Sequence, residues 1–475
     1  MKVFYQRLSL LLLILILIVP TALAATAPAV VNKVRFSQTP EAIRIVFDMD
    51  KLPAYKVTLN ENPANLIVEF DGVLDKTVNP EIPIKDSAVT GVKLSSRSPG
   101  KVTASIDLKT AVQYKVFALK SPNRLVIDLI KVYEQKLIEQ IGPGIKLTTL
   151  MRGRQDGAIL AHILDIDPSA GYILKPVLSN DAIVNLETVK SMADRTQAIA
   201  AVNASYFALS GDILGLTKID STIVSTAGLS RTAMGIGQDG KVMIGQVDYD
   251  GALILPNGTR MAVAGVNCER GANNLVLYNR YYDAATDTNP YGIEYTIIND
   301  MVTAINTNNS PIPADGVVLS AHGTAAQSLA ALKIGDKIKI TETLGPVWDQ
   351  AVHVLGAGPT LVKNNGVYLS TKAEEFGPDV ASGRAPRTAL GVTKDGHILL
   401  AVVDGRQYSS VGFTLLEMAL FMQEAGAIQA MNLDGGGSSE MVVSGNVVNK
   451  PSDLRERRVG SALVVLPKTP IKLAN

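Results

Sequence analysis

The residue types that could do chemistry concentrate between residues 397 and 440, where two apolar runs each end in an Asp-Gly pair. Residues 397–403 lead into Asp404-Gly405-Arg406, and residues 428–433 lead into Asp434-Gly435-Gly436-Gly437-Ser438-Ser439. Three consecutive glycines let the backbone approach a ligand closely and could turn several N–H groups inward as an anion-binding nest. Asp434 beside such a nest could serve as an acid, a base or a metal ligand, and Ser438 adds a hydroxyl donor.

The segment between the two Asp-Gly pairs predicts how they are positioned. Thr414 and Glu417 form a capping box, an apolar helix over 415–425 follows, and Gly426 can end it. Strand, helix and strand with a short crossover form a parallel βαβ unit. Both pairs should therefore lie at the carboxyl edge of one sheet, where ligand sites of α/β proteins form. A glycine-rich turn alone is usually only a turn, but the second pair, followed by Arg406, favours a site.

Three further motifs place polar side chains at strand ends. Arg231-Thr232 and Arg387-Thr388 open two similar segments. The fork of an Arg suits two phosphate oxygens and the Thr hydroxyls add donors, although each Arg could instead cap a carboxylate structurally. Asn203 follows an apolar strand and could orient a sugar hydroxyl or bond to backbone in a turn. His322 follows another strand and is the histidine retained as a site candidate.

The sequence also argues against several kinds of site and partner. The four histidines lack metal-binding spacing and Cys268 is the single cysteine, so a zinc site and an intramolecular disulfide are not expected. No Gly-x-Ser-x-Gly elbow is present for a Ser–His–Asp triad. The metal content stays undetermined: a calcium ion held by Asp and backbone oxygens is an open alternative without a recognisable loop. A near-neutral chain without a basic block argues against nucleic-acid binding.

The N-terminus predicts an export signal at residues 1–24. Lys2 and Arg7 precede an apolar run over 8–19, and a small-residue Ala-Leu-Ala triplet follows, as in a secretory signal and its cleavage site. The run is shorter than the roughly 18 residues of a membrane span. The mature chain is therefore expected outside the cytoplasm, secreted or in the cell envelope, without a transmembrane span after cleavage. An uncleaved anchor is the alternative.

Residues 32–130 contain a duplication with strand-like alternation. Residues 55–57 recur as 114–116, and residues 62–70 recur as 121–129. Two equivalent sheets packed face to face, a small β-sandwich, bury such a pattern most simply. This region resembles the AMIN domain, a β module of exported bacterial envelope proteins, which implies binding to peptidoglycan; a spacer without a ligand is the alternative. Residues 131–145 predict a short polar helix and a linker.

Matching segments spread over residues 146–467 resemble one family in its own order. They are Asn203-Ala204-Ser205-Tyr206-Phe207, the turn at 211–216, Arg231-Thr232-Ala233, Leu319-Ser320-Ala321-His322-Gly323, residues 356–362, Arg387-Thr388-Ala389-Leu390-Gly391, Val403-Asp404-Gly405-Arg406, Asn432-Leu433-Asp434-Gly435-Gly436-Gly437-Ser438-Ser439, and Asn449-Lys450-Pro451-Ser452-Asp453 with Arg457. The family is that of the phosphodiester glycosidases, in its bacterial exopolysaccharide-related branch. Two departures are visible: the common Asn-Gly-Gly opening is Asn203-Ala204-Ser205, and Glu440 stands where relatives often carry Thr.

The resemblance implies an exported hydrolase that cleaves a sugar–phosphate glycosidic bond in a cell-wall or exopolysaccharide glycopolymer, releasing free sugar and a phosphomonoester. Asp434 and Asp404 would supply the carboxylates that an oxocarbenium-like transition state needs. Asn203 and His322 would address sugar hydroxyls. The remaining expected substrate-binding residues, led by the two phosphate-binding arginines of the repeated motif, are Arg231, Arg387, Thr232, Thr388, Arg406, Gly435, Gly436, Gly437 and Ser438.

Two alternatives use the same residues. A non-catalytic protein that binds wall glycopolymer would keep the arginines without needing Asp434, and a transferase would pass the glycosyl or phosphoglycosyl group to an acceptor other than water. The sequence leaves open the sugar, the partner on the phosphate, the stereochemical course and the oligomeric state. The expected fold class is α+β: a small N-terminal β-sandwich followed by a large catalytic-type domain of mixed sheet and helix.

Overall fold

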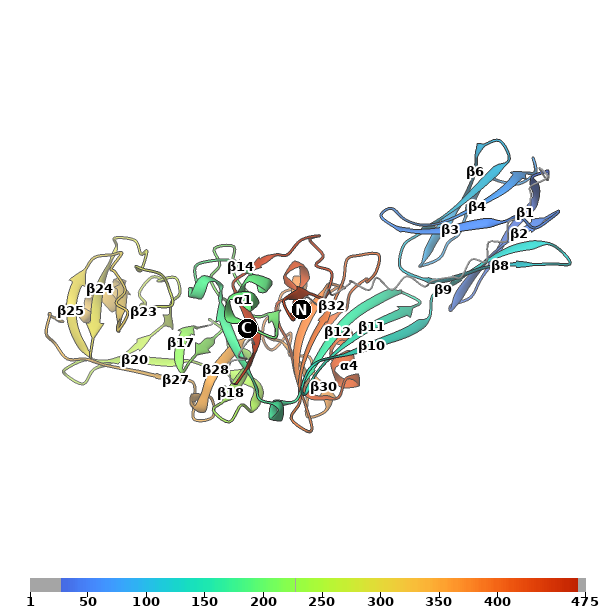
Figure 1. The fold of residues 1–475 in the computed structure, drawn as a ribbon. Coiled ribbons are helices and arrows are strands. Elements are labelled where there is room, and N and C mark those ends of the chain that lie inside the picture. The colour runs from blue at the N-terminus through green and yellow to red at the C-terminus, as the bar shows by residue number, and fades with distance from the viewer. Residues whose placement is uncertain (1–26, 227, 469–475) are drawn as a thin grey trace, which may run out of the picture.

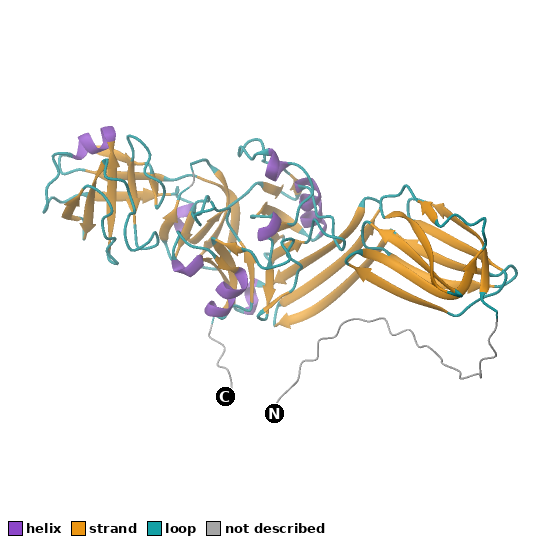
Figure 2. Ribbon diagram, turned by 90° about the horizontal axis from the view of Figure 1, so that it is seen from above, coloured by secondary structure: helices purple, strands orange, loops and turns teal. Residues whose placement is uncertain are grey.

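The computed structural model describes residues 27–226 and 228–468, and the predicted leader at 1–24 lies outside the described residues. Three bodies lie in a row: an N-terminal β module, a central body and a distal β body (Figure 1, Figure 2). Strands make up 51% of the structure and helices 9%. The α+β expectation is therefore corrected to a mostly β protein. Within the described ranges, no helix is both long and apolar enough to cross a membrane.

The N-terminal module is a sandwich of two sheets around one core. One sheet has the order β1-β2-β9-β8 and the other β5-β6-β7-β4-β3, and the two are joined where β1 pairs with β4. The rings of Phe47 and Phe70, one from each sheet, lie 6.0 Å apart in the shared core. The strands are β1 (Ala29–Gln38), β2 (Ala42–Met49), β3 (Tyr55–Glu61), β4 (Ala64–Leu74), β5 (Glu81–Pro83), β6 (Val89–Ser98), β7 (Lys101–Leu108), β8 (Gln113–Leu119) and β9 (Arg124–Ile130).

The two sequence repeats are exchanged between these sheets. β1 and β2 of the first repeat are joined to β9 and β8 of the second, whereas β6 and β7 of the second repeat are joined to β4 and β3 of the first. Each sheet thus contains half of each repeat. The sandwich follows from the alternation of apolar residues, but alternation does not specify which strand pairs with which, so the exchange was not predictable.

The segment expected to be a polar helix and linker is instead a strand, so that prediction was wrong. β10 (Tyr133–Gly142) forms the edge of the central sheet beside β11 (Ile145–Arg154), and Lys131 and Val132 connect it to β9. Most side chains of β10 are exposed on both faces, including Leu137 and Ile138. A strand without a buried face shows little alternation, and its charged residues protect an open sheet edge.

The eight-stranded central sheet carries both Asp-Gly pairs. Its order is β10-β11-β12-β32-β31-β33-β29-β30. β32 and β33 both run antiparallel to β31, which lies between them, so they are parallel to each other and their carboxyl ends share one edge. The remaining strands of this sheet are β12 (Gly157–Ile166), β29 (Thr360–Lys363), β30 (Gly366–Val367), β31 (Arg387–Thr393), β32 (Ile398–Val403) and β33 (Ala427–Asn432).

The predicted βαβ unit is confirmed, with β31 as an additional antiparallel strand between its two strands. α4 (Leu415–Glu424) connects β32 to β33 and begins with the predicted capping box of Thr414 and Glu417. Gly426 follows the helix with a φ of 96°, a left-handed conformation that glycine adopts without steric cost. The other helices are α1 (Val189–Thr196), α2 (Gly323–Leu329) and α3 (Pro378–Ala381).

Five smaller sheets complete the central and distal bodies. In the central body they are formed by β13 (Tyr172–Leu178), β15 (Ala200–Asn203), β34 (Met441–Val443), β35 (Asn446–Val447) and β37 (Ser461–Pro467); by β14 (Glu187–Thr188) and β36 (Arg458–Val459); and by β16 (Thr217–Ile219), β17 (Thr222–Ser225), β18 (Arg231–Gly237), β19 (Val242–Val247) and β28 (Ala351–Gly356). The first and third of these pack against the eight-stranded sheet in one large core.

The distal body lies at the opposite end of the molecule from the N-terminal module (Figure 1). Its two sheets pack around one hydrophobic core, which also includes residues from the adjoining part of the central body. They contain β20 (Asp250–Ile254), β21 (Arg260–Val263) and β27 (Lys339–Thr343), and β22 (Gly265–Val266), β23 (Leu275–Tyr278), β24 (Gly292–Ile298), β25 (Met301–Asn306) and β26 (Gly316–His322).

Candidate active site

Asp404 and Asp434 follow two parallel strands that flank β31. β31 begins at Arg387, which lies opposite Val403 at the end of β32. Two strand spacings separate β32 from β33, so the backbones of the two aspartates are roughly 10 Å apart. The tertiary structure therefore brings both aspartates and the Arg387-Thr388 pair to one edge of one sheet.

Asp434 is half-buried at the end of β33. The Gly435 N–H donates a hydrogen bond to its Oδ1 at 2.8 Å, and its own N–H donates to the Ala204 oxygen at 2.9 Å. Burial raises the pKa of Asp434 to about 6, against smaller lowering effects of Ser438, the Gly435 N–H and Arg457. A carboxyl group with this pKa can take up or release a proton near neutral pH.

Asp404 lies in a different environment and is only 1% exposed. Asn449 Nδ2 donates to its Oδ1 at 3.0 Å and the Lys450 N–H donates to its Oδ2 at 3.0 Å. Burial raises the pKa of Asp404 to about 6, and these two donors oppose that shift. The Asp404 carboxylate therefore fixes the loop at 449–450, and Asp434 is the more accessible of the two aspartates.

The glycine loop after Asp434 is not the open nest of amides expected from sequence. η4 (Gly436–Ser438) is a short 3-10 turn. The Gly435 N–H donates to Asp434, and the Gly436 N–H donates to the Pro386 oxygen at 2.9 Å. Two of the three amides are therefore used inside the protein, because the turn needs them to attach the loop to its neighbours.

Two exposed arginines lie against this loop, and its glycines allow them to approach. A Cβ at Gly436 would lie 3.5 Å from Arg406 Nη1, and a Cβ at Gly437 would collide with the Arg457 guanidinium. Arg457 Nη2 also pairs with Asp453 at 2.6 Å. The two guanidinium groups place positive charge beside Asp434. Arg406 was selected from sequence as a site residue; Arg457 was recognised only as part of the last family-like segment and was not selected.

Arg231 reaches the same region from another sheet. Its guanidinium lies 4.2 Å from the ring centroid of Phe376, and that ring lies 5.7 Å from the ring of Tyr206. Burial, and then the charge of Asp434, raise the pKa of Tyr206, whereas Arg231 lowers it slightly. Tyr206 is therefore within electrostatic reach of Asp434, and Arg231 and Tyr206 both lie against the Phe376 ring. Tyr206 was part of a recognised motif but was missed as a site residue, since a tyrosine after a strand is ordinarily a core residue.

Arg387 is not free to hold a phosphate. Its Nε, Nη1 and Nη2 donate to the backbone oxygens of Phe413 at 3.0 Å, Val380 at 3.1 Å and Gly383 at 3.1 Å, and the residue is 3% exposed. The guanidinium thus connects residues 380–383 with Phe413 inside the protein. The structural alternative considered from sequence describes Arg387 better, with carbonyl oxygens in place of a carboxylate.

Asn203 and Thr388 form a fully buried layer beneath Asp434. Asn203 Nδ2 donates to the backbone oxygen of Asp434 at 2.6 Å. Its Oδ1 accepts from Thr388 Oγ1 at 2.7 Å and from the Glu440 N–H at 3.2 Å. Neither side chain has exposed surface. Asn203 therefore positions the backbone of Asp434 and does not face a sugar, because its amide is already used at both ends.

Thr232 and His322 also lie away from the exposed side of Asp434. Thr232 is buried and its N–H donates to Glu374 Oε2 at 2.9 Å. His322 ends β26 in the distal body, where the Asn273 N–H donates to its Nδ1 at 3.4 Å. Among residues 27–226 and 228–468, no group of three or more His, Cys, Asp or Glu side chains is arranged to hold a metal ion.

Glu440 is a buried carboxyl group that the sequence showed only as a departure from the family pattern. Burial, reinforced by the neighbouring Glu456 carboxyl group, raises its pKa, and the residue is 1% exposed. A raised pKa favours folding below the unfolded value of roughly 4.3, and this contribution is lost as the pH rises through the folded value.

We predict that Glu440→Gln increases the free energy of unfolding by about 1–3 kcal/mol at pH 8 and by much less at pH 5. The glutamine keeps the shape of the side chain and removes the buried charge. Denaturant unfolding at both pH values measures the effect. The exposed Glu41, changed to Gln, is the control and should show no gain at either pH. The same gain from Glu440→Gln at pH 5 and pH 8 would contradict the prediction.

Comparison with known proteins finds one family match in the N-terminal part of the chain and another in the C-terminal part. Residues 33–129 match the AMIN domain, and residues 291–466 match the phosphodiester glycosidase family. The second match includes Asp404, Asp434 and Arg457. It begins after Asn203 and Arg231, so the roles of these two residues rest on geometry alone.

Three of the similar proteins illustrate the extent of the match. The SPbeta prophage-derived uncharacterized protein YomE of Bacillus subtilis is 44% identical over 81 residues, 17% of this chain and 12% of that protein. The N-acetylglucosamine-1-phosphodiester alpha-N-acetylglucosaminidase of Mus musculus is 33% identical over 121 residues, 24% of this chain and 23% of that protein. The chain thus spans less than a quarter of the length of either relative. A hypothetical protein from Synechocystis shares the fold, with a TM-score of 0.66 and 22% identity over 93% of this chain and 81% of that one.

The family matches and the placement of Asp434 within the longer of them lead to one assignment. The chain combines an AMIN domain at residues 33–129 with a match to the phosphodiester glycosidase domain at residues 291–466.

Proposed function

We propose that this chain is an exported bacterial envelope enzyme that hydrolyses a sugar-1-phosphodiester in a cell-wall or exopolysaccharide glycopolymer. The observation that carries the proposal is the half-buried Asp434, with a pKa of about 6, followed by a glycine loop against which the Arg406 and Arg457 side chains lie. A carboxylate beside positive charge suits a bond between a sugar carbon and a phosphate oxygen. The Mus musculus relative, named for a phosphodiester of N-acetylglucosamine, supports this bond type.

The residues divide the reaction between them. The bond from the sugar C1 to the phosphate oxygen breaks, water supplies the hydroxyl group to C1, and its remaining proton ends on the aqueous solvent or on the phosphomonoester. Arg406 and Arg457 neutralise the charge that develops on the departing phosphate, so less acid catalysis is required. Asp434 stabilises the positive charge at C1 and acts as the nucleophile or the base. Asn203 acts beneath it as a positioning residue, and Asp404 holds the loop at residues 449–450.

The location outside the cytoplasm is part of the same proposal. The AMIN domain supports a position at the cell wall, with peptidoglycan as the partner of this domain, and the signal-like sequence at residues 1–24 supports export. A wall-bound enzyme would meet an extended glycopolymer at high local concentration, because binding through one domain makes the second encounter intramolecular.

The test is an assay of the full mature chain on a synthetic sugar-1-phosphodiester, with the products identified. Free sugar and a phosphomonoester in equal amounts are expected. Sugar attached to an added acceptor alcohol in place of water would show transfer. A protein that binds isolated wall material but releases no sugar from any such substrate would be the non-catalytic binder, and the proposed hydrolysis would be wrong.

Replacing either exposed arginine should weaken substrate binding. We predict that Arg406→Ala and Arg457→Ala each raise KM about 10-fold or more, because a charge-assisted contact to phosphate contributes about 1.5–3 kcal/mol. Steady-state kinetics on the phosphodiester measure this. Arg260→Ala, which removes an exposed arginine paired with Asp250 in the distal body, is the matched control and should leave KM unchanged. Wild-type KM values in Arg406→Ala and Arg457→Ala, as in the Arg260→Ala control, would exclude a phosphate-binding role for the loop arginines.

A further inference from the structure

The loop that follows β32 connects the candidate site to the N-terminal module. It carries Asp404 and Arg406 toward the site and, two residues later, Tyr408 toward the module. Hydrogen bonds hold the two ends of this loop together. Ser410 Oγ donates to the backbone oxygen of Asp404 at 2.6 Å, and Gln407 and Ser410 exchange backbone hydrogen bonds at 3.0 and 3.2 Å. A displacement of Tyr408 would therefore be passed to Arg406 along a short and closed loop.

Tyr408 is held by the N-terminal module. Its side chain packs against the hydrophobic core of that module. Its backbone oxygen accepts hydrogen bonds from the Ala111 N–H at 2.9 Å and from Thr110 Oγ1 at 3.3 Å. Burial, and then the nearby Tyr133 and Glu61, raise the pKa of the Tyr408 hydroxyl to about 12, so the ring is withdrawn from solvent.

A second connection reaches the loop that carries Lys450. Gln407 Nε2 donates to the Lys450 oxygen at 2.6 Å, and the Lys450 N–H donates to the Asp404 carboxylate. The Lys450 side chain pairs with Glu61 of the N-terminal module at 3.4 Å. Both partners of that pair are mostly exposed, so the ion pair itself contributes little. The backbone contacts made by Tyr408 are the stronger link.

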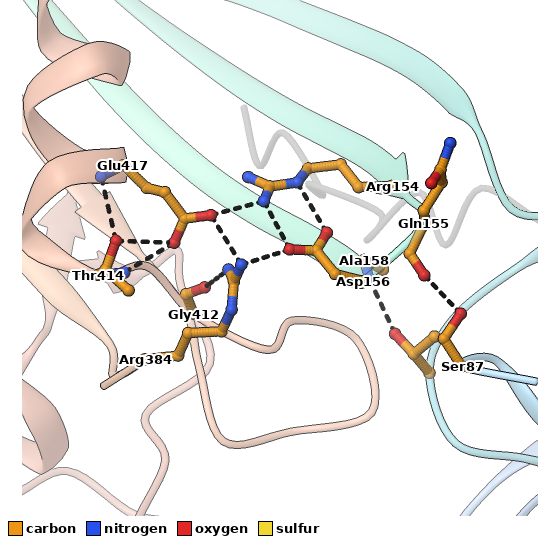
Figure 3. A network of polar contacts seen from close by, with 10 residues as sticks. Ser87, Arg154, Gln155, Asp156, Ala158, Arg384, Gly412, Thr414 and Glu417 are labelled. Atoms are coloured by element: carbon orange, nitrogen blue, oxygen red, sulfur yellow. Dashed lines mark hydrogen bonds and ion pairs between the residues drawn. The ribbon is translucent and has the colours of Figure 1, made fainter. Parts of the chain in front are cut away.

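A network of hydrogen bonds and ion pairs joins the segments beside this loop (Figure 3). Thr110 Oγ1 accepts from the Ala158 N–H at 2.9 Å, which joins the module to the start of β12. Next to it, Arg154 and Arg384 share the carboxylates of Asp156 and Glu417, and Arg384 donates to the Gly412 oxygen at 3.1 Å. The far end of the loop is thereby fixed to the helix α4 that leads to Asp434.

We propose that Tyr408 is a positioning residue through which the N-terminal module sets the placement of Arg406 and Asp404. The module is then a structural part of the candidate site, in addition to any binding of the cell wall. The kinetic consequence rests on the proposed function; the placement of the loop does not. Replacing Tyr408 should loosen residues 404–411 without altering a group that touches substrate.

The test uses the full mature chain with Tyr408→Ala, Tyr408→Phe and Thr110→Val. We expect amide hydrogen exchange in residues 404–411 to become about 10-fold faster or more in Tyr408→Ala, since local opening exchanges amides that packing protects. KM for the phosphodiester should rise about 10-fold, with kcat changed by about 3-fold at most. Tyr408→Phe keeps the ring and should restore wild-type exchange and KM. Tyr55→Ala, a tyrosine of the module placed on strand β3, is the control and should change neither.

The two readouts separate this inference from the proposed function. If the wild type releases no sugar, the proposed function fails, and hydrogen exchange alone decides the role of Tyr408. Wild-type exchange in residues 404–411 of a folded Tyr408→Ala protein would overturn the inference. If Tyr408→Ala unfolds throughout, Thr110→Val decides: faster exchange in residues 404–411, in addition to that of the Ala158 amide whose hydrogen bond Thr110 also accepts, supports the inference, and unchanged exchange in 404–411 overturns it.

Discussion

Asp434→Asn should abolish sugar release and, at pH 7, raise the melting temperature of the protein. The loss of activity should be about 10³-fold or more, because in the proposed reaction the carboxylate stabilises the positive charge at C1 and an amide cannot carry the negative charge that this requires. The gain in stability has a separate origin. Burial raises the pKa of Asp434 to about 6, so ionisation of this group in the folded protein is unfavourable.

The sign of the stability change follows from that pKa. The neutral acid favours folding below the unfolded pKa of roughly 3.9, and this contribution is lost as the pH rises to about 6. Two pKa units correspond to about 3 kcal/mol, and partial exposure of the carboxylate reduces this to about 1–3 kcal/mol. Asp434→Asn removes the unfavourable charge and keeps an oxygen for the Gly435 N–H. The wild type should therefore melt a few degrees lower than Asp434→Asn at pH 7, and at nearly the same temperature at pH 4.

Thermal unfolding at pH 4 and pH 7, beside the sugar-release assay, measures both effects. Asp395→Asn is the matched control, because Asp395 lies exposed in the turn before β32 and should change neither activity nor melting. An Asp434→Asn protein that keeps more than about a tenth of the activity would remove Asp434 from the reaction. A variant that melts below the wild type at pH 7 would show that the carboxylate is not in an unfavourable environment.

Lys131→Met should destabilise the protein by about 3–5 kcal/mol. Lys131 lies at the joint between the N-terminal module and the central body, and its Nζ pairs with Asp86 at 2.7 Å. The two side chains are 4% and 8% exposed. Methionine preserves most of the apolar stem, so the main effect is an uncompensated carboxylate in the joint. Denaturant unfolding measures the change.

Two controls isolate the effect of burial. Lys93→Met breaks a pair of nearly the same length, 2.8 Å to Asp107, on the exposed surface of the same module, and should have a much smaller effect because solvent screens the pair. Lys131→Met combined with Asp86→Asn should regain much of the loss, since no unpaired charge remains while the asparagine oxygen can still accept from the Ala88 N–H. If Lys131→Met and Lys93→Met have equal effects, burial does not determine the contribution of the pair.

Local patterns predicted the parts of the fold that depend on neighbouring residues. The capping box at Thr414, the apolar helix behind it and the strands that end at Asp404 and Asp434 are as expected, because caps and strand ends are determined within a few residues. The strand β10 was missed because an edge strand exposed on both faces lacks the alternation that identifies strands. The expected α+β class gave too much weight to helix for a related reason. Short strands separated by turns contain too few residues to show a clear alternation of apolar and polar side chains.

The functional residues show the same division. The sequence selected Asp434, Asp404, Arg231 and Arg406, all of which the fold brings into or next to one region. It could not distinguish the buried Arg387 from the more accessible Arg231, since both stand in the same Arg-Thr motif. The guanidinium of Arg387 meets three backbone oxygens, and that encounter depends on loops outside its own motif.

The sequence by itself determined the duplicated N-terminal module, the family of the C-terminal region and the pairing of two aspartates with glycine turns, because each is encoded in local pattern and spacing. The tertiary structure decided which polar groups stay accessible. Asn203, Thr388 and Arg387 use their hydrogen-bonding capacity inside the protein, whereas Arg406 and Arg457 lie exposed over the glycine loop. It also decided that the module contacts the loop of Asp404 through Tyr408. Burial and partner choice are properties of the whole chain, since they arise where segments distant in sequence meet.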